Sequence, residues 1–562
     1  MPSGVAATTR RPEFSTPVTL RELCRPVRWP VVASRTCSKL ARTIFFVSSS
    51  PAQKPLNPPT PDVALANSQE TALVRLARWR PADVISSWYW AGTVALLAGV
   101  LRLINLATPP QKIFDEAFYA KHAHDLLGHG YELNDQSNGP GYVAHPPLGK
   151  WCISLGEWLF GYNSLGWRIS AAVFGTLSVL ILCRLGRRMF RSTVLGCLAG
   201  LLMALDGLHF VSSRVALLDI FLMFFVLASF ACLLLDREQR RDAMHAQLLR
   251  AEQNGSDLRA GVRRESGWRN WPWWRIAAAV MLGCALGVKW SAIWYLLVLV
   301  LLIVVWEVQA RRSAGVRQPL TDVIGWETGW IAAFVLITLG TFLASYTGWF
   351  ATDGGWDRNW AQANSAGVWY LPDALVSLWH YQYDIYQFHV NLSSPHPYQS
   401  TPYSWLYLGR PVLYYRETRP CGTTTCTSGI LALGNPALWW TFLAASAVCL
   451  WRSAINRDWR ALAILLSAAA GIVPWMLYPD RTTYFFYALP ALPFLVLAVT
   501  LVLGMILGSD NARASRRLTG TLLVGVYVVL VVVAFAYFYP IYSGQAIPFD
   551  DWHNRLWFDS WK

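Results

Sequence analysis

Two adjacent carboxylates, Asp115 and Glu116, stand in the stretch KIFDEAFYAKHAHDLL at residues 112–127. A carboxylate within hydrogen-bond reach of a hydroxyl group can take up its proton, so either residue is a candidate general base. A structural role is the alternative, because Asp is a preferred N-cap residue and Glu in the first turn favours the helix dipole. Apolar residues recur at helical spacing through this stretch, which predicts a short helix on a membrane surface.

Four basic residues near or within apolar segments are further candidates, because ionisable groups in a membrane are costly and are functional hypotheses by default. Arg168 stands before an apolar segment, Arg214 lies about a turn and a half from Asp219 by helical rise, and Lys289 interrupts a nearly unbroken apolar run. Arg481 opens a late aromatic stretch. Anchoring to lipid headgroups or an ion pair would also explain charges at these places.

The elements that must position these groups are membrane helices. The chain has 562 residues, of which 54% are hydrophobic and 14% are charged, fractions far outside those of a soluble domain. A spanning helix needs about 20 mainly apolar residues. Eleven segments meet this requirement, near 86–106, 168–186, 193–211, 216–235, 273–289, 291–309, 326–346, 430–451, 460–478, 484–507 and 519–540. The sequence therefore predicts an all-α polytopic membrane protein with about eleven spans.

The short loops predict the orientation of the chain, because cytoplasmic loops retain Lys and Arg. Every second connection is basic, namely 184–191, 236–275, 310–318, 451–460 and 511–517. We therefore expect the N-terminus in the cytoplasm, and the C-terminus on the outer face with two long loop regions, 107–167 and 347–429. The net charge of +15 therefore mostly reflects the Lys and Arg of the predicted cytoplasmic loops. Dispersed arginines do not form a continuous nucleic-acid-binding face.

Residues 1–82 contain Pro clusters, several Arg and few acids, without a long apolar run. This composition predicts a disordered basic cytoplasmic extension ahead of a transmembrane domain at 83–562. The extension lacks the apolar core of a cleaved signal peptide, so the first membrane helix would act as an uncleaved insertion signal.

Most of the ten cysteines lie in membrane or cytoplasmic segments, where packing as small apolar side chains explains them. Cys421 and Cys426 instead fall in an outer-face stretch, RPCGTTTCTSG, where a disulfide is permitted. Two free thiols are the alternative. Neither this pair nor the histidines near the acids, His122, His124 and His129, have the spacing of a defined metal site.

An ordered series of motifs resembles the protein O-mannosyltransferase family over roughly residues 84–562. The series consists of FDE at 114–116, HPPLGKW at 145–151, Arg168 before a span, SRVALLD at 213–219, VKW at 288–290 and RTTYFFYALPALPF at 481–494. The resemblance implies a GT-C type membrane glycosyltransferase. Such an enzyme moves mannose from a polyprenyl- or dolichyl-phosphate carrier to Ser or Thr hydroxyls of exported proteins, with inversion at the anomeric carbon.

The resemblance also implies roles for individual residues. The acidic pair that carries the catalytic role in the family corresponds to Asp115 and Glu116, and the arginine required for activity corresponds to Arg168. The segment 347–429 is too short for the three-repeat sugar-binding insert of the eukaryotic branch and resembles the shorter bacterial, especially actinobacterial, form. The expected donor is then polyprenyl-phosphate mannose, and the expected location is a bacterial plasma membrane.

In this expected reaction a carboxylate must take the proton of the acceptor hydroxyl as the new bond forms. Asp115 is the expected base, and Glu116 is the second candidate; otherwise Glu116 would orient the acceptor or hold the loop. His145 and Lys150 belong to a supporting loop, in which the two prolines after His145 fix an extended turn.

The leaving lipid phosphate requires cationic partners in the transition state. Arg168 is the first candidate, followed by three further residues near the outer membrane surface, Arg214, Lys289 and Arg481. Guanidinium groups can replace the divalent metal that many nucleotide-sugar enzymes use, so no cofactor is required for this chemistry. The metal dependence stays open at this point.

Three other functions fit parts of the same pattern. A GT-C enzyme that glycosylates a lipid or polysaccharide would share the acidic loop and differ in its acceptor. A transporter or lipid flippase predicts internal repeats or matching broken helices, which the sequence does not show. A non-enzymatic scaffold leaves Lys289, Asp219 and the HPP loop unexplained. The expected partners are the lipid donor, exported acceptor proteins, the bilayer and, as a further candidate, the protein-export channel, with no nucleic acid.

Overall fold

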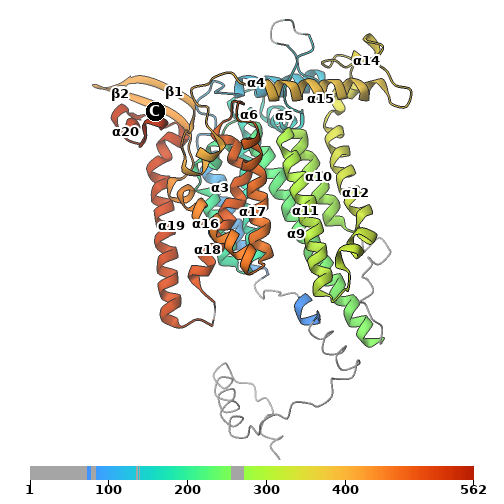
Figure 1. The fold of residues 1–562 in the computed structure, drawn as a ribbon. Coiled ribbons are helices and arrows are strands. Elements are labelled where there is room, and N and C mark those ends of the chain that lie inside the picture. The colour runs from blue at the N-terminus through green and yellow to red at the C-terminus, as the bar shows by residue number, and fades with distance from the viewer. Residues whose placement is uncertain (1–71, 78–83, 135–136, 138, 255–270, 510) are drawn as a thin grey trace, which may run out of the picture. The chain divides into compact units, whose positions relative to one another are not determined.

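A computed structural model describes residues 72–77, 84–134, 137, 139–254, 271–509 and 511–562. Most of these residues are helical, and the long helices run side by side (Figure 1). Eight segments are long and apolar enough to cross a membrane. They are α6 (Ser164–Phe190), α9 (Leu218–Gln253), η4 with α11 (Trp290–Ser313), α12 (Pro319–Ser345), α16 (Pro436–Ile455), α17 with η6 (Trp459–Leu477), η7 with α18 (Phe485–Leu507) and α19 (Ala514–Ser543).

Each of the eleven predicted spans contains an apolar helix, but three of these helices are not among the eight candidate spans. They are α3 (Ser86–Leu103), α7 (Thr193–Ala204), which is followed by the short α8 (Gly207–Ser212), and α10 (Trp273–Val288). α7 has 12 residues and α10 has 16, fewer than the about 20 that a straight span needs. The mostly helical, multi-pass fold is confirmed, whereas the number eleven stays a prediction.

The segments predicted as outer loops form a second group of elements at one end of the membrane helices (Figure 1). These elements are α4 (Glu116–His129), α5 (Leu148–Phe160), α13 (Thr347–Ala351), α14 (Trp360–Ala363), α15 (Asp373–Asn391), η5 (Pro402–Tyr407), α20 (Phe549–His553) and η8 (Asp559–Trp561). α15 lies across the ends of the membrane helices. Tyr142 of the first loop region donates a hydrogen bond to the Asp384 carbonyl of the second, at 3.3 Å, so the two regions are packed together.

A small antiparallel sheet interrupts the helical fold. β1 (Val412–Cys421) pairs with β2 (Thr424–Ala432), and β2 pairs with the short β3 (Ile547–Pro548). Cys421 and Cys426 form a disulfide near the turn of this hairpin. The prediction of an all-α protein missed these strands, which contain Val, Tyr, Thr and Ile, residues typical of strands, on the two sides of a Gly-containing turn.

α9 is longer than the sequence indicated. The predicted span ends near residue 235, and the following segment was expected to be a basic loop, but α9 continues to Gln253. Met244 and Leu248 stand one turn apart on this extension and are buried in a small cluster that also contains Leu76. The extension therefore retains an apolar stripe that packs against other helices.

The predicted N-terminal extension at 1–82 falls outside the described residues except for 72–77. Within that short piece, residues 72–76 are helical. Ala72 and Leu76 are buried in the cluster that contains Met244, so this part of the segment is packed rather than disordered.

Seven charged side chains are buried together where α9, α10, α11 and α12 meet: Asp236, Arg240, Arg275, Glu307, Arg311, Asp322 and Glu327. Arg275 lies at the centre, 2.8 Å from Asp236, 2.7 Å from Glu307 and 2.9 Å from Glu327. Some arginines that the sequence assigned to basic loops are therefore members of an internal ion network that joins four helices.

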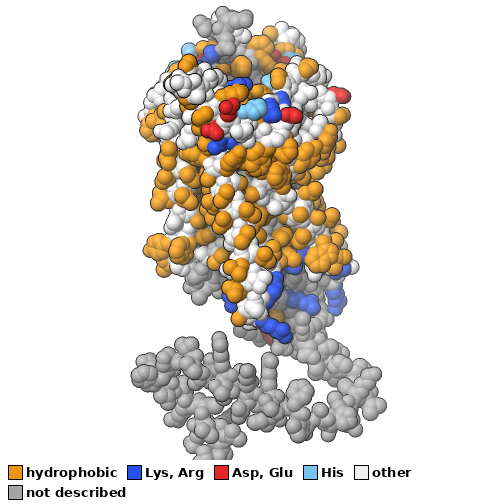
Figure 2. Space-filling model, turned by 90° about the vertical axis from the view of Figure 1, so that its left-hand side faces the viewer, with side chains coloured by type: hydrophobic (Ala, Val, Ile, Leu, Met, Phe, Trp, Pro, Cys, Tyr) orange, Lys and Arg blue, Asp and Glu red, His pale blue; other side chains and the backbone are white. Residues whose placement is uncertain are grey.

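The surface has the pattern of a membrane protein. On the face shown in Figure 2, hydrophobic side chains form a broad band; Lys and Arg occur at both ends, and at the end opposite the outer group of elements few acidic side chains accompany them. α19 contributes exposed apolar residues to this surface, including Leu522, Val526 and Val529. A band of this kind is compatible with a lipid environment and not with water.

Candidate active site

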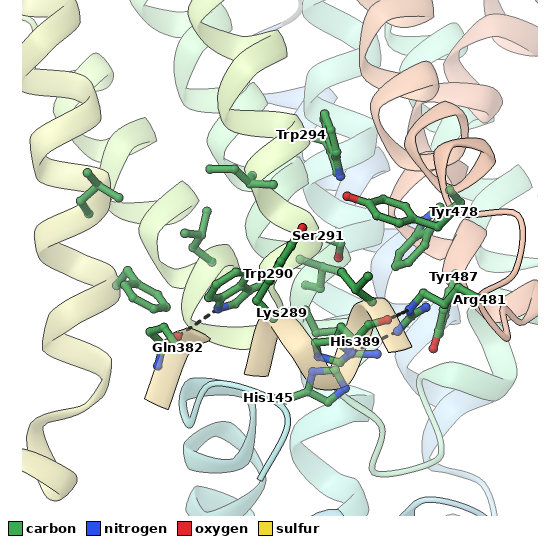
Figure 3. A pocket seen from close by; sticks show the side chains of 18 of the residues that line it. His145, Lys289, Trp290, Ser291, Trp294, Gln382, His389, Tyr478, Arg481 and Tyr487 are labelled. Carbon is green, nitrogen blue, oxygen red and sulfur yellow. Dashed lines mark hydrogen bonds between the residues drawn. The ribbon is translucent and has the colours of Figure 1, made fainter. Parts of the chain in front are cut away.

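A cavity of about 660 Å³ lies between α15 and the ends of several membrane helices (Figure 3). Its body is apolar, with Leu222, Leu286, Leu339, Phe342, Leu343 and Leu378 among the lining residues. Its polar lining includes His145, Asp219, Lys289, His389 and Arg481. Figure 3 shows His145, His389 and Arg481 close together at one end, and Trp294 at the other. The cavity is suited to a ligand with an apolar chain and an anionic head.

Asp115 immediately precedes α4 and occupies its N-cap position, but its side chain makes no capping hydrogen bond. The carboxylate of Glu116, the first residue of α4, accepts a hydrogen bond from the amide of Ile113 at 3.0 Å, which closes the turn before the helix. The side chain of Asp115 therefore does not cap the helix, which was the structural alternative, and its carboxylate is available for another role.

The backbone just before Asp115 is strained. Phe114 has a left-handed conformation, with φ at 49°, which costs a bulky residue roughly 1–3 kcal/mol. Its ring stacks on Tyr414 of β1 at 4.7 Å between centroids and meets the edge of Phe486 of η7 at 5.9 Å. Two buried rings from distant parts of the chain thus clamp Phe114 and fix the direction in which Asp115 leaves the turn.

The surroundings of Asp115 make it more basic than an ordinary aspartate. Burial raises the pKa of Asp115 to about 6, the positive charge of Lys289 opposes this rise, and the negative charge of Asp219 adds to it. A carboxylate with such a pKa is mostly deprotonated at neutral pH and still accepts a proton readily. Asp115 therefore has the protonation state that a general base requires.

Glu116 is engaged on both carboxylate oxygens. Oε1 accepts from Arg168 Nε at 2.8 Å and from the Ala216 amide at 2.9 Å, and Oε2 accepts from Arg168 Nη2 at 2.7 Å and from the Ile113 amide. The side chain is fully buried. These four donors tie Glu116 to α6 and to the backbone at Ile113 and Ala216.

Arg168 and Arg214 do not line the cavity. The remaining donors of Arg168 are satisfied by backbone carbonyls, including that of Pro109 at 2.7 Å. Arg214 donates to the carbonyls of Arg102 at 2.7 Å and Ile104 at 2.6 Å, at the C-terminal end of α3. Both side chains are buried in structural contacts, so the geometry does not bring them to the predicted donor phosphate.

Lys289 and Arg481, in contrast, both reach the cavity. Lys289 Nζ lies 2.7 Å from Asp219 Oδ2, which is the ion pair that the sequence offered as an alternative for Asp219. Arg481 donates to the His389 carbonyl at 2.8 Å and to His389 Nδ1 at 3.1 Å. Among the described residues no carboxylate forms a salt bridge with Arg481, so its charge can bind an external anion.

Two histidines next to these charges are neutral. The rings of His145 and His389 stack at 5.0 Å between centroids. Burial and the neighbouring positive charges lower the pKa of His389 to about 4 and lower that of His145 well below its ordinary value. His389 Nε2 donates to the Ala144 carbonyl at 2.7 Å, which leaves Nδ1 to accept from Arg481 and orients the guanidinium.

Lys150 supports the HPP turn rather than the cavity itself. Its ammonium group donates to the His145 carbonyl at 2.9 Å and pairs with Glu132. The position of His145 at the end of the cavity thus depends on a buried ion pair behind it. The supporting roles predicted for His145 and Lys150 stay predictions.

Sequence reasoning missed several residues of the site. Tyr414 and Phe486, which clamp Phe114, and His389 and Gln382, which line the cavity from α15, were not named. No periodicity in the sequence of α15 singles out which side of this helix faces inward. Tyr414 could have been found only by recognising the hairpin.

Comparisons with known proteins show which family the chain resembles. Residues 92–352 match the family described as dolichyl-phosphate-mannose-protein mannosyltransferase, and residues 374–561 match the C-terminal four TMM region of protein-O-mannosyltransferase. A polyprenol-phosphate-mannose–protein mannosyltransferase of Mycolicibacterium smegmatis (strain ATCC 700084 / mc(2)155) is 40% identical over 498 residues, covering 86% of this chain and 94% of the relative. One of Corynebacterium glutamicum is 33% identical over 504 residues, covering 85% and 94%.

A solved structure shares the fold. The S. cerevisiae protein O-mannosyltransferase Pmt1-Pmt2 complex bound to the sugar donor aligns with a TM-score of 0.66 at 15% identity, covering 87% of this chain and 94% of that chain. Together with the family matches over most of the chain, the shared fold defines a membrane glycosyltransferase with the GT-C fold. The identity to the bacterial relatives extends over most of both chains. The chain therefore belongs to the protein O-mannosyltransferase family.

Proposed function

We propose that this protein transfers mannose from polyprenyl-phosphate mannose to Ser and Thr hydroxyls of exported proteins. The names of the bacterial relatives, at 33–40% identity, support this donor and this acceptor class. The structural observation that carries the proposal is Arg481, a guanidinium without a described acidic partner at the charged end of an apolar cavity. The loop that contains Asp115 lies beside that end, within electrostatic reach of Lys289.

The donor would be divided between the two parts of the cavity. Its polyprenyl chain would follow the leucine-lined body, where apolar contact replaces contact with water. Its phosphate would contact Arg481, with Lys289 as the second cation. Lys289 is held by Asp219 in this structure, so it would approach the phosphate while still partly neutralised, and Arg481 would supply most of the binding energy.

The chemical step needs one base and one stabilised leaving group. Asp115 accepts the proton of the acceptor hydroxyl as the hydroxyl oxygen forms a bond to C1 of mannose. The bond between C1 and the phosphate oxygen breaks at the same time, and its electron pair leaves with the polyprenyl phosphate. Arg481 and Lys289 stabilise the charge that develops on this phosphate. Attack opposite the leaving group inverts the anomeric carbon.

Arg168, Glu116 and Arg214 take part as supports. The Glu116–Arg168 pair connects the start of α4 to α6, and Arg214 fixes the end of α3, from which the catalytic loop departs. In this assignment the acidic motif contains one base and one structural residue. The arginine that follows the HPP segment acts through the loop rather than through the phosphate.

The site is expected on the outer face of a bacterial plasma membrane, with a cytoplasmic N-terminus. At the end opposite the outer group of elements, Lys and Arg have few acidic side chains beside them (Figure 2), and the positive-inside rule associates such an end with the cytoplasm. Acceptor proteins would then reach the site as they leave the cell, and docking near the protein-export channel would present them before they fold.

The acceptor class is tested with purified protein in lipid nanodiscs, radiolabelled polyprenyl-phosphate mannose, and two acceptors offered separately. A Thr-rich peptide should become mannosylated, and an extract of membrane lipids should not. A matched peptide with Thr replaced by Val is the control for hydroxyl dependence. Transfer of label to lipid alone would favour the GT-C enzyme with a lipid or polysaccharide acceptor and would overturn the proposal.

A further inference from the structure

Outside the cavity, three side chains with metal-ligand chemistry converge on the outer group of elements. Asp357 lies between α13 and α14, and His380 and Asp384 stand one turn apart on α15. His380 Nδ1 is 3.5 Å from Asp357 Oδ2 and 3.5 Å from Asp384 Oδ2. The potential ligand atoms of all three residues lie within 4.8 Å of one another.

The distances from His380 Nδ1 to the two carboxylates are longer than those of an ordinary hydrogen bond. An N–H···O bond is about 2.7–3.2 Å long, and His380 Nδ1 is buried without a hydrogen-bond partner. Zinc binds imidazole nitrogen at about 2.0–2.1 Å and carboxylate oxygen at about 2.0–2.2 Å. At a tetrahedral angle, two such ligands stand about 3.4 Å apart, close to the separations observed here.

The imidazole of His380 is held in one orientation by its neighbour Trp360. Its ring lies flat on Trp360, with 3.8 Å between centroids and an interplanar angle of 11°. This stacking fixes the direction of Nδ1, which points between the two carboxylates. A histidine held in this way loses little conformational entropy when it binds a metal.

The charge around the three residues favours a cation. Two carboxylates face one imidazole, and no described Lys or Arg pairs with either carboxylate. The adjacent Arg358 is turned to the carbonyls of Trp349 and Phe350, at 3.2 Å and 3.3 Å. Arg358 follows Asp357 in the sequence but does not neutralise the cluster. A divalent ion would neutralise it.

We propose that Asp357, His380 and Asp384 bind a divalent transition-metal ion, with Zn²⁺ as the best match to one nitrogen and two oxygen ligands. Imidazole selects such ions over Mg²⁺ and Ca²⁺, and water completes the coordination. The ion ties the segment between α13 and α14 to α15. Because Leu378, Gln382 and His389 of α15 line the donor cavity, the ion stabilises one wall of that cavity without taking part in the transfer.

The test measures metal binding directly on full-length protein in nanodiscs, after treatment with a chelator and its removal. Titration with ZnCl₂, followed by calorimetry and elemental analysis, should find one tightly bound Zn²⁺ per chain. Asp357→Asn and Asp384→Asn preserve side-chain size and should each weaken binding at least about tenfold, since even outer-shell changes cost about 10- to 100-fold. Asp353→Asn, an exposed carboxylate of the same segment, is the matched control and should bind like the wild type.

Two further readouts separate this site from the transfer reaction. Zn²⁺ should slow tryptic cleavage after Arg358 in the wild type and not in Asp384→Asn. It should also lower the KM for the lipid donor with little change in kcat; this last readout rests on the proposed function, whereas binding and proteolysis do not. Equal Zn²⁺ binding by the wild type and the Asp357→Asn/Asp384→Asn double variant would overturn the proposal, as would binding of Ca²⁺ or Mg²⁺ in preference to Zn²⁺.

Discussion

The guanidinium of Arg168 holds the carboxylate of Glu116 through two parallel hydrogen bonds, from Nε at 2.8 Å and from Nη2 at 2.7 Å. Neither side chain is more than 1% exposed. Such a bidentate pair is directional as well as strong. It joins α6 to the first turn of α4, and the candidate base Asp115 is the residue immediately before that turn. An arginine at this place can be essential without touching a substrate.

Breaking the pair on one side should therefore destabilise the protein. Arg168→Ala leaves Glu116 buried and unpaired, which costs about 3–5 kcal/mol, so the melting temperature in detergent should fall sharply. Arg168→Lys should rescue little, because an ammonium group cannot reproduce the fork of contacts. The double variant Glu116→Gln/Arg168→Met should recover much of the melting temperature while transfer stays low. A loss of donor affinity in Arg168→Lys with an unchanged melting temperature would instead place Arg168 at the phosphate.

Transfer should depend on pH through Asp115. With a pKa of about 6, the carboxylate is the active form, so kcat/KM should rise from pH 5 to pH 7 by about tenfold and then level off. The phosphodiester of the donor does not titrate in this range, and donor binding measured at each pH is the control. A profile that is flat between pH 5 and pH 7 would contradict the role of Asp115 as the base.

Donor binding should depend on Arg481. Its guanidinium has no described acidic partner, and the loss of hydrogen bonds to a charged group costs about 1.5–3 kcal/mol, equivalent to about 10- to 150-fold in affinity. Arg481→Ala should weaken binding of polyprenyl phosphate by this factor, as measured by calorimetry in nanodiscs. Arg419→Ala removes an exposed arginine of the β1–β2 hairpin and should have no effect. Equal affinity in the two variants would rule out Arg481 as the phosphate ligand.

The clamp on Phe114 should affect turnover more than binding. Tyr414→Leu removes an aromatic contact worth about 0.5–1.5 kcal/mol, so kcat should fall by about 2- to 13-fold with little change in the KM for the donor. Tyr414→Phe keeps the stacked ring and should retain activity near that of the wild type. If Tyr414→Phe lost as much activity as Tyr414→Leu, the phenol hydroxyl rather than the ring would be the important group.

The elements that a local pattern defines were predictable from sequence. Apolar runs located helices at all eleven predicted spans, and the recurrence of apolar residues after Asp115 located α4. The continuation of α9 to Gln253 was not predictable in this way, because its many charged residues are typical of a loop. Only the fold shows that Asp236 and Arg240 form buried ion pairs with residues of other helices. The β1–β2 hairpin was missed because a short stretch of Tyr and Thr in an aromatic outer segment also fits a loop.

The site was predictable in its residues but less in their roles. A motif identifies Asp115, Glu116 and Arg168, yet nothing in the sequence shows that the last two, 52 positions apart, bind each other. Arg214 and Arg481 are both basic residues near the outer ends of helices. Only the fold shows that carbonyls surround Arg214 while Arg481 faces a cavity.

The central claim, that Asp115 is the base while other residues hold the donor, is tested most directly by Asp115→Asn. The purified variant should bind polyprenyl phosphate with the affinity of the wild type. It should melt at the same or a higher temperature, because a buried charge has been removed. Transfer of mannose to the Thr-rich peptide should fall by about 10²- to 10⁴-fold. Transfer at the rate of the wild type in a variant with unchanged donor binding would contradict the account.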